Sequence, residues 1–292
     1  MIHKEYFKNR VVSALVLSVI IVLSSLISVL FMLDPEYQSK IFLGVENFKY
    51  YTTISNFLIS IIVMLTIPFQ IEGIKKQNYH LPNWVVNILY FGVGNLAIVF
   101  LATAFVIAPT IGINKALLGR FNFWQHSVSP LLSIILFLFV DKDHRIKLKI
   151  SLYCMIPNVI YMIIYVVFAG ALKNTSYAWP DVYRITKFGH YEIALVGWFL
   201  LHFLIINLVR VLHNIQHRRY KQSLEEYYRN SEDYKDKSIE EIIKNIALDQ
   251  KAKHVSGDID IPVHILRYYT NMDGNTMSLD DMCMLYAKYY FT

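Results

Sequence analysis

The chain is dominated by long apolar runs that carry few or no charges. The first, Val11 to Leu33, would extend about 34 Å as an α-helix, enough to cross the roughly 30 Å hydrocarbon core of a bilayer. It is too long for the core of a signal peptide and is followed by no small-residue cleavage site, so we expect an uncleaved first span. Five further runs follow: Tyr51 to Phe69, Trp84 to Ala108, Trp124 to Val140, Ile150 to Ala171 and Tyr191 to Leu212. The sequence therefore predicts an all-α polytopic bundle of six transmembrane helices.

Basic residues are concentrated in alternate connecting segments, and this bias predicts the orientation. The denser set comprises the amino end, the second and fourth loops, and the segment after the sixth run, with Lys4, Lys8, Arg10, Lys75, Lys76, Lys142, Arg145, Lys147, Lys149, Arg210, Arg218, Arg219 and Lys221. We therefore expect an integral membrane protein with both termini cytoplasmic. The motif Asp141-Lys-Asp-His144 in the fourth loop could suggest a metal site, but a solvated loop that sets topology is the preferred interpretation, and no cofactor is expected.

The net charge of +6 hides a division of the chain into two parts. From His213 to Thr292 there are 11 basic and 13 acidic residues, so the positive excess belongs to the membrane part. Loops that meet anionic lipid explain that excess without nucleic-acid binding. We predict a six-helix transmembrane domain over 1–212 and a small helical cytoplasmic tail over 213–292. In the tail, Ser238-Ile-Glu-Glu241 is a capping-box pattern that predicts a helix start. The tail could bind a partner, although a helical appendage is the preferred interpretation.

Polar side chains enter the second run at its beginning. Thr52, Ser55 and Asn56 stand at i, i+3 and i+4, which places them on one helical face. Groups that need hydrogen bonds are costly in hydrocarbon, so polar residues of this kind usually line a bundle interior or a cavity. The three residues form either a packing device or part of a site.

A second polar entry point begins the fourth run, at Phe123-Trp-Gln-His126-Ser-Val-Ser-Pro130. Proline cannot donate to the carbonyl four residues earlier, which is that of His126, so a kink is predicted there. An imidazole can act as a base near neutral pH. Alone, His126 is better explained as a structural residue. With the amino end inside, however, the second and fourth runs both enter from the outer side, so Thr52 and His126 are expected at similar depth.

The fifth loop lies on the same predicted face, and its Trp179, Asp181 and Tyr183 are candidate site-lining residues, as is His202 of the sixth run. Interfacial Trp and Tyr are common membrane anchors, and Asp181 could orient a histidine or pair with Arg184. His202, near the middle of the sixth run, could face His126 or bond to a neighbouring helix. Three amides also fall inside predicted spans, and we expect them to bridge helices: Asn95, Asn158 and Asn207.

These segments resemble a known family. Phe48-Lys49-Tyr50-Tyr51-Thr52-x-x-Ser55-Asn56, Trp124-Gln125-His126-x-x-x-Pro130, Tyr161 and Trp179-Pro180-x-x-Tyr183 look like the androgen-induced-protein family of six-span membrane threonine hydrolases, in its bacterial-type branch. In the animal members a threonine and a histidine hydrolyse fatty acid esters of hydroxy fatty acids. The resemblance covers roughly residues 45 to 185 and implies a nucleophile at Thr52 and a base at His126. The animal pattern has an acidic residue where Ser55 stands, and the tail after residue 213 has no counterpart.

Two functions are therefore carried forward. The first is an integral-membrane lipid ester hydrolase in which Thr52 attacks, His126 transfers the proton, and the face of Ser55 and Asn56 stabilises the oxyanion. Its partners would be membrane lipids and an acyl-chain substrate entering between helices. The second is a non-catalytic membrane protein, either a small-solute carrier or a scaffold for a partner. Against a carrier, no inverted repeat with matching broken helices is evident.

Overall fold

The computed structural model describes residues 2–33, 48–76, 81–119, 122–141, 144–176, 178–179, 191–230, 238–255 and 284. The described residues form helices, with π-helical turns (η) inserted between α-helical stretches. The elements are α1 (Ile2–Leu33), α2 (Tyr51–Lys76), α3 (Asn83–Ala102), η3 (Thr103–Ile107), α4 (Ala108–Ile111), η4 (Asn114–Leu118), η5 (Phe123–Val128), α6 (Ser129–Ile135), η6 (Leu136–Val140), α7 (Leu148–Tyr165), η7 (Val166–Ala171), α8 (Tyr191–Asn230) and α9 (Ile239–Val255).

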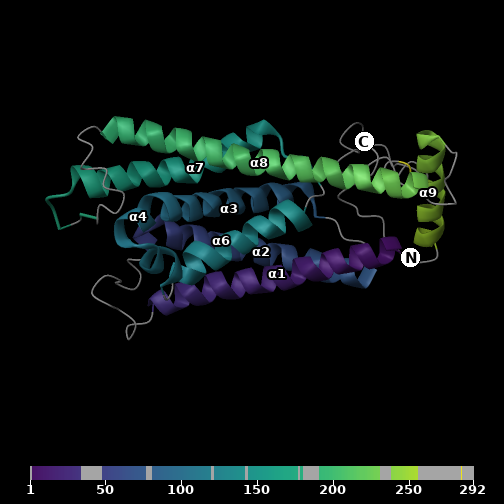
Figure 1. Ribbon diagram of the computed structural model, residues 1–292, viewed down its shortest axis with the longest axis horizontal. Helices are drawn as coiled ribbons and strands as arrows, with labels where there is room; N and C mark the ends of the chain where they lie inside the picture. Colours follow the sequence, from purple (N-terminus) through teal and green to yellow (C-terminus); the bar gives the residue numbers. More distant parts are fainter. Residues whose placement is uncertain are drawn as a thin grey trace.

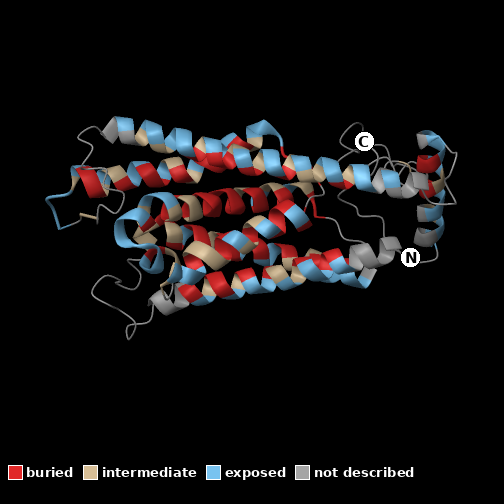
Figure 2. Cartoon of the chain, viewed as in Figure 1, coloured by how far each residue is buried: buried red, intermediate tan, exposed pale blue. Residues whose placement is uncertain are grey.

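The prediction of six membrane-spanning helices is confirmed. Six stretches of the described chain are long and apolar enough to cross a bilayer: Asn9–Ser28, Tyr51–Lys75, Asn83–Ile111, Phe123–Val140, Leu148–Ala171 and Leu195–Ser223. Their outward faces remain apolar, since Val16 and Leu23 on α1 are each 51% exposed, and Figure 2 shows exposed residues along α1 and α8 at the two flanks of the bundle. An apolar surface of this extent suits hydrocarbon rather than water as the surrounding medium. The protein is an integral membrane bundle.

The bundle is organised around α3. Of the six spans, the one that contains α3 has the largest buried share. It packs against α2 and α6 on one side and against α7 and α8 on the other, and Figure 1 shows α7 and α8 lying along the flank opposite α1. A helix that is apolar around its whole circumference is expected at such a central position.

Small residues allow the helices around α3 to approach closely. The inward stripe of α1 carries Ala14, Ser18 and Ser25 against its neighbours, and α1 packs most extensively on α2. On α3, a Cβ added at Gly92 would lie 2.6 Å from Ile59 Cδ1 and 3.0 Å from Ile62 Cδ1 of α2. Gly92 therefore acts as a spacer that leaves room for the buried side chains of Ile59 and Ile62, as small residues commonly do in membrane interfaces.

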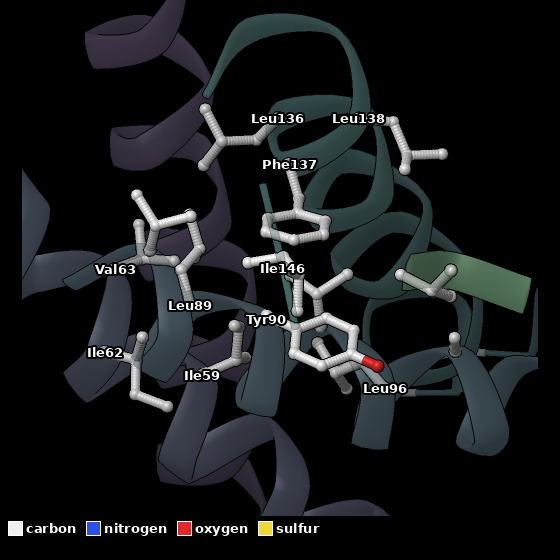
Figure 3. Packing of buried hydrophobic residues seen from close by; sticks show 14 of the residues in the cluster. Ile59, Ile62, Val63, Leu89, Tyr90, Leu96, Leu136, Phe137, Leu138 and Ile146 are labelled. Atoms are coloured by element: carbon white, nitrogen blue, oxygen red, sulfur yellow. The ribbon is translucent and has the colours of Figure 1, made fainter. Parts of the chain in front are cut away.

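Tyr90 joins three helices at the centre of the core. Its hydroxyl donates to the carbonyl of Ile206 on α8 at 2.9 Å and shares a 2.9 Å hydrogen bond with Ser151 on α7. Its ring stacks on Phe137 of η6, with centroids 5.7 Å apart, and Figure 3 shows Tyr90 and Phe137 beside Ile146 and Leu89. This buried hydroxyl fixes the rotation of α7 and α8 relative to α3.

Buried polar residues close the end of the bundle where α1 begins. Arg10 donates from Nε to Val140 O at 2.7 Å and from Nη1 to the Tyr220 hydroxyl at 3.1 Å. The ring nitrogens of His213 lie 3.0 Å from Phe137 O and 2.9 Å from His144 O. The loop after η6 is thereby held against α1 and α8.

The expectation of a solvated fourth loop is wrong for the two residues of the Asp141-to-His144 motif that the structure describes. Asp141 is fully buried and His144 is 8% exposed, and His144 Nε2 lies 2.8 Å from the carbonyl oxygen of Leu81. A polar side chain can be buried when the backbone supplies its partner, so this loop has a packing role that charge counting could not reveal.

The tail begins as a continuation of the last span. Helix α8 passes without a break through His213, where the sequence suggested a domain boundary, and ends at Asn230. The predicted capping box is confirmed: Ser238 N donates to Glu241 Oε2 at 2.9 Å, and Glu241 N donates to Ser238 Oγ at 3.3 Å. Helix α9 then lies across the end of the bundle (Figure 1).

Replacing Tyr90 by Phe should lower the stability of the bundle by about 0.6 to 1.7 kcal/mol, the range measured for interhelical hydrogen bonds in membranes. The change removes the Tyr90 hydroxyl, so that the Ser151 hydroxyl and the carbonyl oxygen of Ile206 lose their hydrogen bonds to it. Thermal unfolding in detergent measures the effect. Tyr153→Phe is the matched control, because Tyr153 lies on α7 and is 60% exposed; equal midpoints for the two variants would contradict the role assigned to Tyr90.

Replacing Gly92 by Ala should destabilise the α2–α3 contact by about 1 to 3 kcal/mol, the usual cost of overpacking. The control is Gly197→Ala on α8, where an added Cβ meets nothing within 4 Å and alanine favours the helix. Thermal unfolding should show a lower midpoint for the first variant and an unchanged or higher midpoint for the second. A Gly92→Ala protein as stable as wild type would refute the spacer role.

Candidate functional site

The polar face predicted at the start of α2 is present. Thr52 lies in the first turn and is half-buried, whereas Ser55 and Asn56 are buried. A short 3₁₀ turn at Phe48 and Lys49 precedes the helix. The exposed neighbours Ile54 and Phe57 face outward, which turns the polar side of this segment into the bundle.

Asn56 connects the beginning of α2 to the beginning of the fourth span. Its Nδ2 donates to Thr52 O at 2.9 Å and to Gln125 O in η5 at 3.1 Å. A side-chain amide has two N–H donors, and both are used here. The segments that carry Thr52 and His126 therefore meet through one buried amide, but Asn56 has no donor left for an oxyanion.

His126 is oriented by a backbone carbonyl. Its Nδ1 lies 2.9 Å from Ala116 O, and because a carbonyl oxygen only accepts, Nδ1 carries the hydrogen in this contact. The basic lone pair of the neutral ring is then on Nε2. The adjacent Ser127 hydroxyl donates to Leu117 O at 2.9 Å, so η4 fixes both side chains. The hydrogen bond to Ala116 O therefore leaves Nε2 as the acceptor nitrogen of the neutral ring.

The predicted effect of Pro130 takes the form of a π-helical turn. Residues Phe123–Val128 form η5, and α6 begins at Ser129 with the proline in its first turn. The Ser129 N–H bonds to Trp124 O, five residues back. This π-helical turn is one of five among the described residues, and it contains His126.

An aromatic cluster borders Thr52. Tyr51 and Tyr161 have ring centroids 4.9 Å apart, the Tyr51 hydroxyl donates to Asn95 Oδ1, and the Tyr161 hydroxyl donates to Lys49 O at 2.9 Å. The hydroxyl of Tyr161, on α7, thus holds the turn just before α2. We call the buried residues Tyr51, Val99, Tyr161, Met162, Tyr165 and Ala169 the Tyr51 cluster.

Among the predicted site-lining residues of the fifth loop, the structure describes Trp179. Its ring stacks on Phe168 with centroids 4.9 Å apart, its backbone N–H donates to Phe168 O at 3.0 Å, and it packs against the Tyr51 cluster. Asp181 and Tyr183 lie outside the described residues. The sequence suggested that Asp181 could orient a histidine; in the structure, the carbonyl oxygen of Ala116 orients the ring of His126.

His202 is buried on α8, which packs against α3 and α7. Neither ring nitrogen has a hydrogen-bond partner within the part of the chain that the structure describes. The expected amide bridges between helices are found for two residues. Asn95 Oδ1 accepts a hydrogen bond from the Tyr51 hydroxyl, and Asn158 Oδ1 on α7 accepts one from Trp198 Nε1 on α8 at 3.2 Å. The expectation for Asn207 is wrong, because its amide bonds to Phe203 O and Arg210 Nε of its own helix.

Several contacts of the site could not be read from the sequence. The carbonyls of Ala116 and Gln125 act through the backbone, so residue type gives no signal for them. Within the described ranges, no group of three or more His, Cys, Asp or Glu residues is placed to hold a metal ion. The arrangement offers a hydroxyl, an oriented imidazole and buried hydrogen-bonding groups, which are the elements of proton transfer and nucleophilic attack.

Comparison with known protein families, with curated proteins and with solved structures finds no match to this chain.

Proposed function

We propose that the protein is an integral-membrane lipid ester hydrolase with Thr52 as nucleophile and His126 as base. The observation that carries this proposal is the double hydrogen bond of Asn56, which ties the Thr52 turn to the segment preceding His126. The bond from His126 Nδ1 to Ala116 O supports it further, because it leaves Nε2 as the basic nitrogen. A threonine hydroxyl becomes an effective nucleophile only when such a base takes its proton.

The proposed reaction proceeds in two stages. Thr52 Oγ1 attacks the ester carbonyl carbon while His126 Nε2 takes the hydroxyl proton, and that proton passes to the departing alcohol oxygen. The acyl group is then bonded to Thr52. A water molecule gives its proton to the same nitrogen and attacks the acyl carbon, which releases the carboxylic acid and returns the hydrogen to Thr52.

The neighbouring residues have different proposed roles. Ser55 is buried on the same face as Thr52 and supplies a hydroxyl to the oxyanion. Asn56 is a positioning residue, since both of its donors hold backbone carbonyls. Trp179 lines the site through its packing on the Tyr51 cluster. Asp181, Tyr183 and His202 are proposed as further lining residues because of their positions in the fifth loop and the sixth run.

We further propose that the site faces the outer side of a bacterial plasma membrane, with both termini cytoplasmic. The excess of Lys and Arg in alternate loops supports this orientation. An even number of spans is consistent with it, as is the position of α9 at the end of the bundle where α1 begins (Figure 1). The substrates would be uncharged acyl lipids that reach the site from the bilayer.

A fluorophosphonate probe tests the nucleophile directly. Wild-type protein and Thr53→Ala should become labelled, whereas Thr52→Ala should not, because only Thr52 offers the activated hydroxyl. His126→Gln should slow labelling by about 100-fold or more, the usual contribution of a general base. In-gel fluorescence and mass spectrometry of the modified peptide measure both effects. Equal labelling of wild type and Thr52→Ala would remove the hydrolase proposal and leave a non-catalytic membrane protein.

Replacing Asn56 by Ala should slow probe labelling by about tenfold, because a poorly held nucleophile loses part of its orientation. The matched control is Ser60→Ala on the same helix, since the hydrogen bonds of Ser60 to described residues go to carbonyls of α2 itself, at Asn56 and Phe57. Rates are compared per folded protein, as judged by size-exclusion chromatography. If Ser60→Ala and Asn56→Ala label at the same rate, Asn56 has no positioning role.

A further inference from the structure

A groove opens between α7 and α8. It encloses about 250 Å³ and is lined on α7 by Asn158, Val159, Met162 and Ile163, and on α8 by Leu195, Val196, Trp198 and Phe199. Both walls belong to predicted membrane spans, Leu148–Ala171 and Leu195–Ser223. The groove therefore lies at a depth where hydrocarbon is the surrounding medium.

The rim of the groove faces the lipid. Ile163 is 55% exposed, Val196 is 60% exposed and Phe199 is 44% exposed. None of the lining residues is charged. A carboxylate or ammonium group would be costly there without a partner, so the chemistry of the walls favours an uncharged hydrocarbon guest that enters from the bilayer.

One polar contact, between Asn158 and Trp198, lies among the otherwise apolar walls of the groove. Trp198 Nε1 donates to Asn158 Oδ1 at 3.2 Å and thereby bridges the two walls, while the amide nitrogen of Asn158 carries two N–H groups as further donors. His202 follows Trp198 at i+4 on α8 but is not one of the residues that line the groove. Its imidazole is fully buried, and neither ring nitrogen is hydrogen-bonded to another described residue.

We propose that this groove binds one acyl chain of an esterified membrane lipid. A volume of about 250 Å³ lies below the roughly 300 to 1,000 Å³ of pockets that enclose drug-sized molecules. It suits one chain better than a whole lipid. The amide of Asn158 can donate to the ester carbonyl, which needs an N–H donor and no charge. An ester therefore fits the groove better than a free fatty acid.

The groove adjoins the region of the candidate site. Met162 belongs to the Tyr51 cluster, and Leu195 and Trp198 pack against it, so three groove residues contact the cluster next to Thr52. A chain in the groove would lie beside this cluster. Binding there requires no nucleophile, and the proposal stands whether or not Thr52 is catalytic.

Photo-crosslinking of the full chain tests the proposal. The protein is placed in phosphatidylcholine nanodiscs that contain a phosphatidylcholine with a diazirine in one acyl chain, irradiated and digested for mass spectrometry. We expect crosslinks within 158–163 and 195–199 to exceed those on the equally lipid-exposed face of α1, where Val16 and Leu23 are each 51% exposed. Labelling of the groove no greater than that of α1 would overturn the proposal.

Two filling variants and one matched control sharpen the experiment. Val159→Phe and Val196→Phe, one on each wall, should each reduce groove labelling by about tenfold, the factor that corresponds to about 1.4 kcal/mol, with α1 labelling unchanged. Ile160→Phe, at the adjacent position, should have no effect, since Ile160 is 53% exposed and does not line the groove. Two variants are used so that the misfolding of one does not decide the result. If the groove of both variants is labelled as strongly as that of wild type, the groove is not the binding site of the acyl chain.

Two further comparisons complete the experiment. One distinguishes a phospholipid from a free fatty acid as the source of the acyl chain, and the other distinguishes binding in the groove from hydrolysis at Thr52. A free fatty acid with the same diazirine chain should label the groove less than the phospholipid does, and stronger labelling would refute the preference for an ester. Thr52→Ala should label the groove like wild type, so a failed hydrolase proposal and a failed groove proposal give different results.

Discussion

The structure depends on hydrogen bonds between helices in a medium that offers none. Lipid tails are as apolar as the helix faces, so helices in a membrane gain little by burying apolar surface against one another. Polar side chains that find a partner on a neighbouring helix supply specificity instead. Tyr90 is the clearest case, since one hydroxyl contacts α7 and α8 from α3. Gln70 with Ser18 joins α2 to α1 in the same manner, and the candidate site uses the same device at Asn56.

Much of the fold was predictable because its determinants are local. Runs of apolar residues long enough to cross the bilayer identify the six spans, and Ser238 with Glu241 identifies the start of α9 through contacts three residues apart. The burial of Asp141 and His144 was not predictable from the loop's charge. Their environment depends on α8 and on Leu81, which are distant in the sequence. The π-turn at Phe123–Val128 likewise has no simple sequence signal beyond Pro130.

The candidate site was predictable to the level of segments. Helical spacing placed Thr52, Ser55 and Asn56 on one face, and the orientation rule placed the His126 segment on the same side. The pairing of Asn56 with Gln125 depends on helix rotation, and the partner atom belongs to the backbone. For that reason the sequence suggested an oxyanion role for Asn56, whereas its two donors are already in use. Asn207 was misjudged because an amide in a helix can also be satisfied by its own helix.

Helix α8 has a mechanical consequence. Its 40 residues extend about 60 Å, roughly twice the thickness of the hydrocarbon core. One end forms a wall of the groove with Phe199, and the far part carries His213 and Tyr220, which hold η6 and Arg10. Because no break interrupts it, the lipid-facing wall of the groove and the start of the tail belong to one continuous helix. The hydrogen bonds of Tyr90, His213 and Tyr220 therefore fix the position of the groove wall and of the tail together.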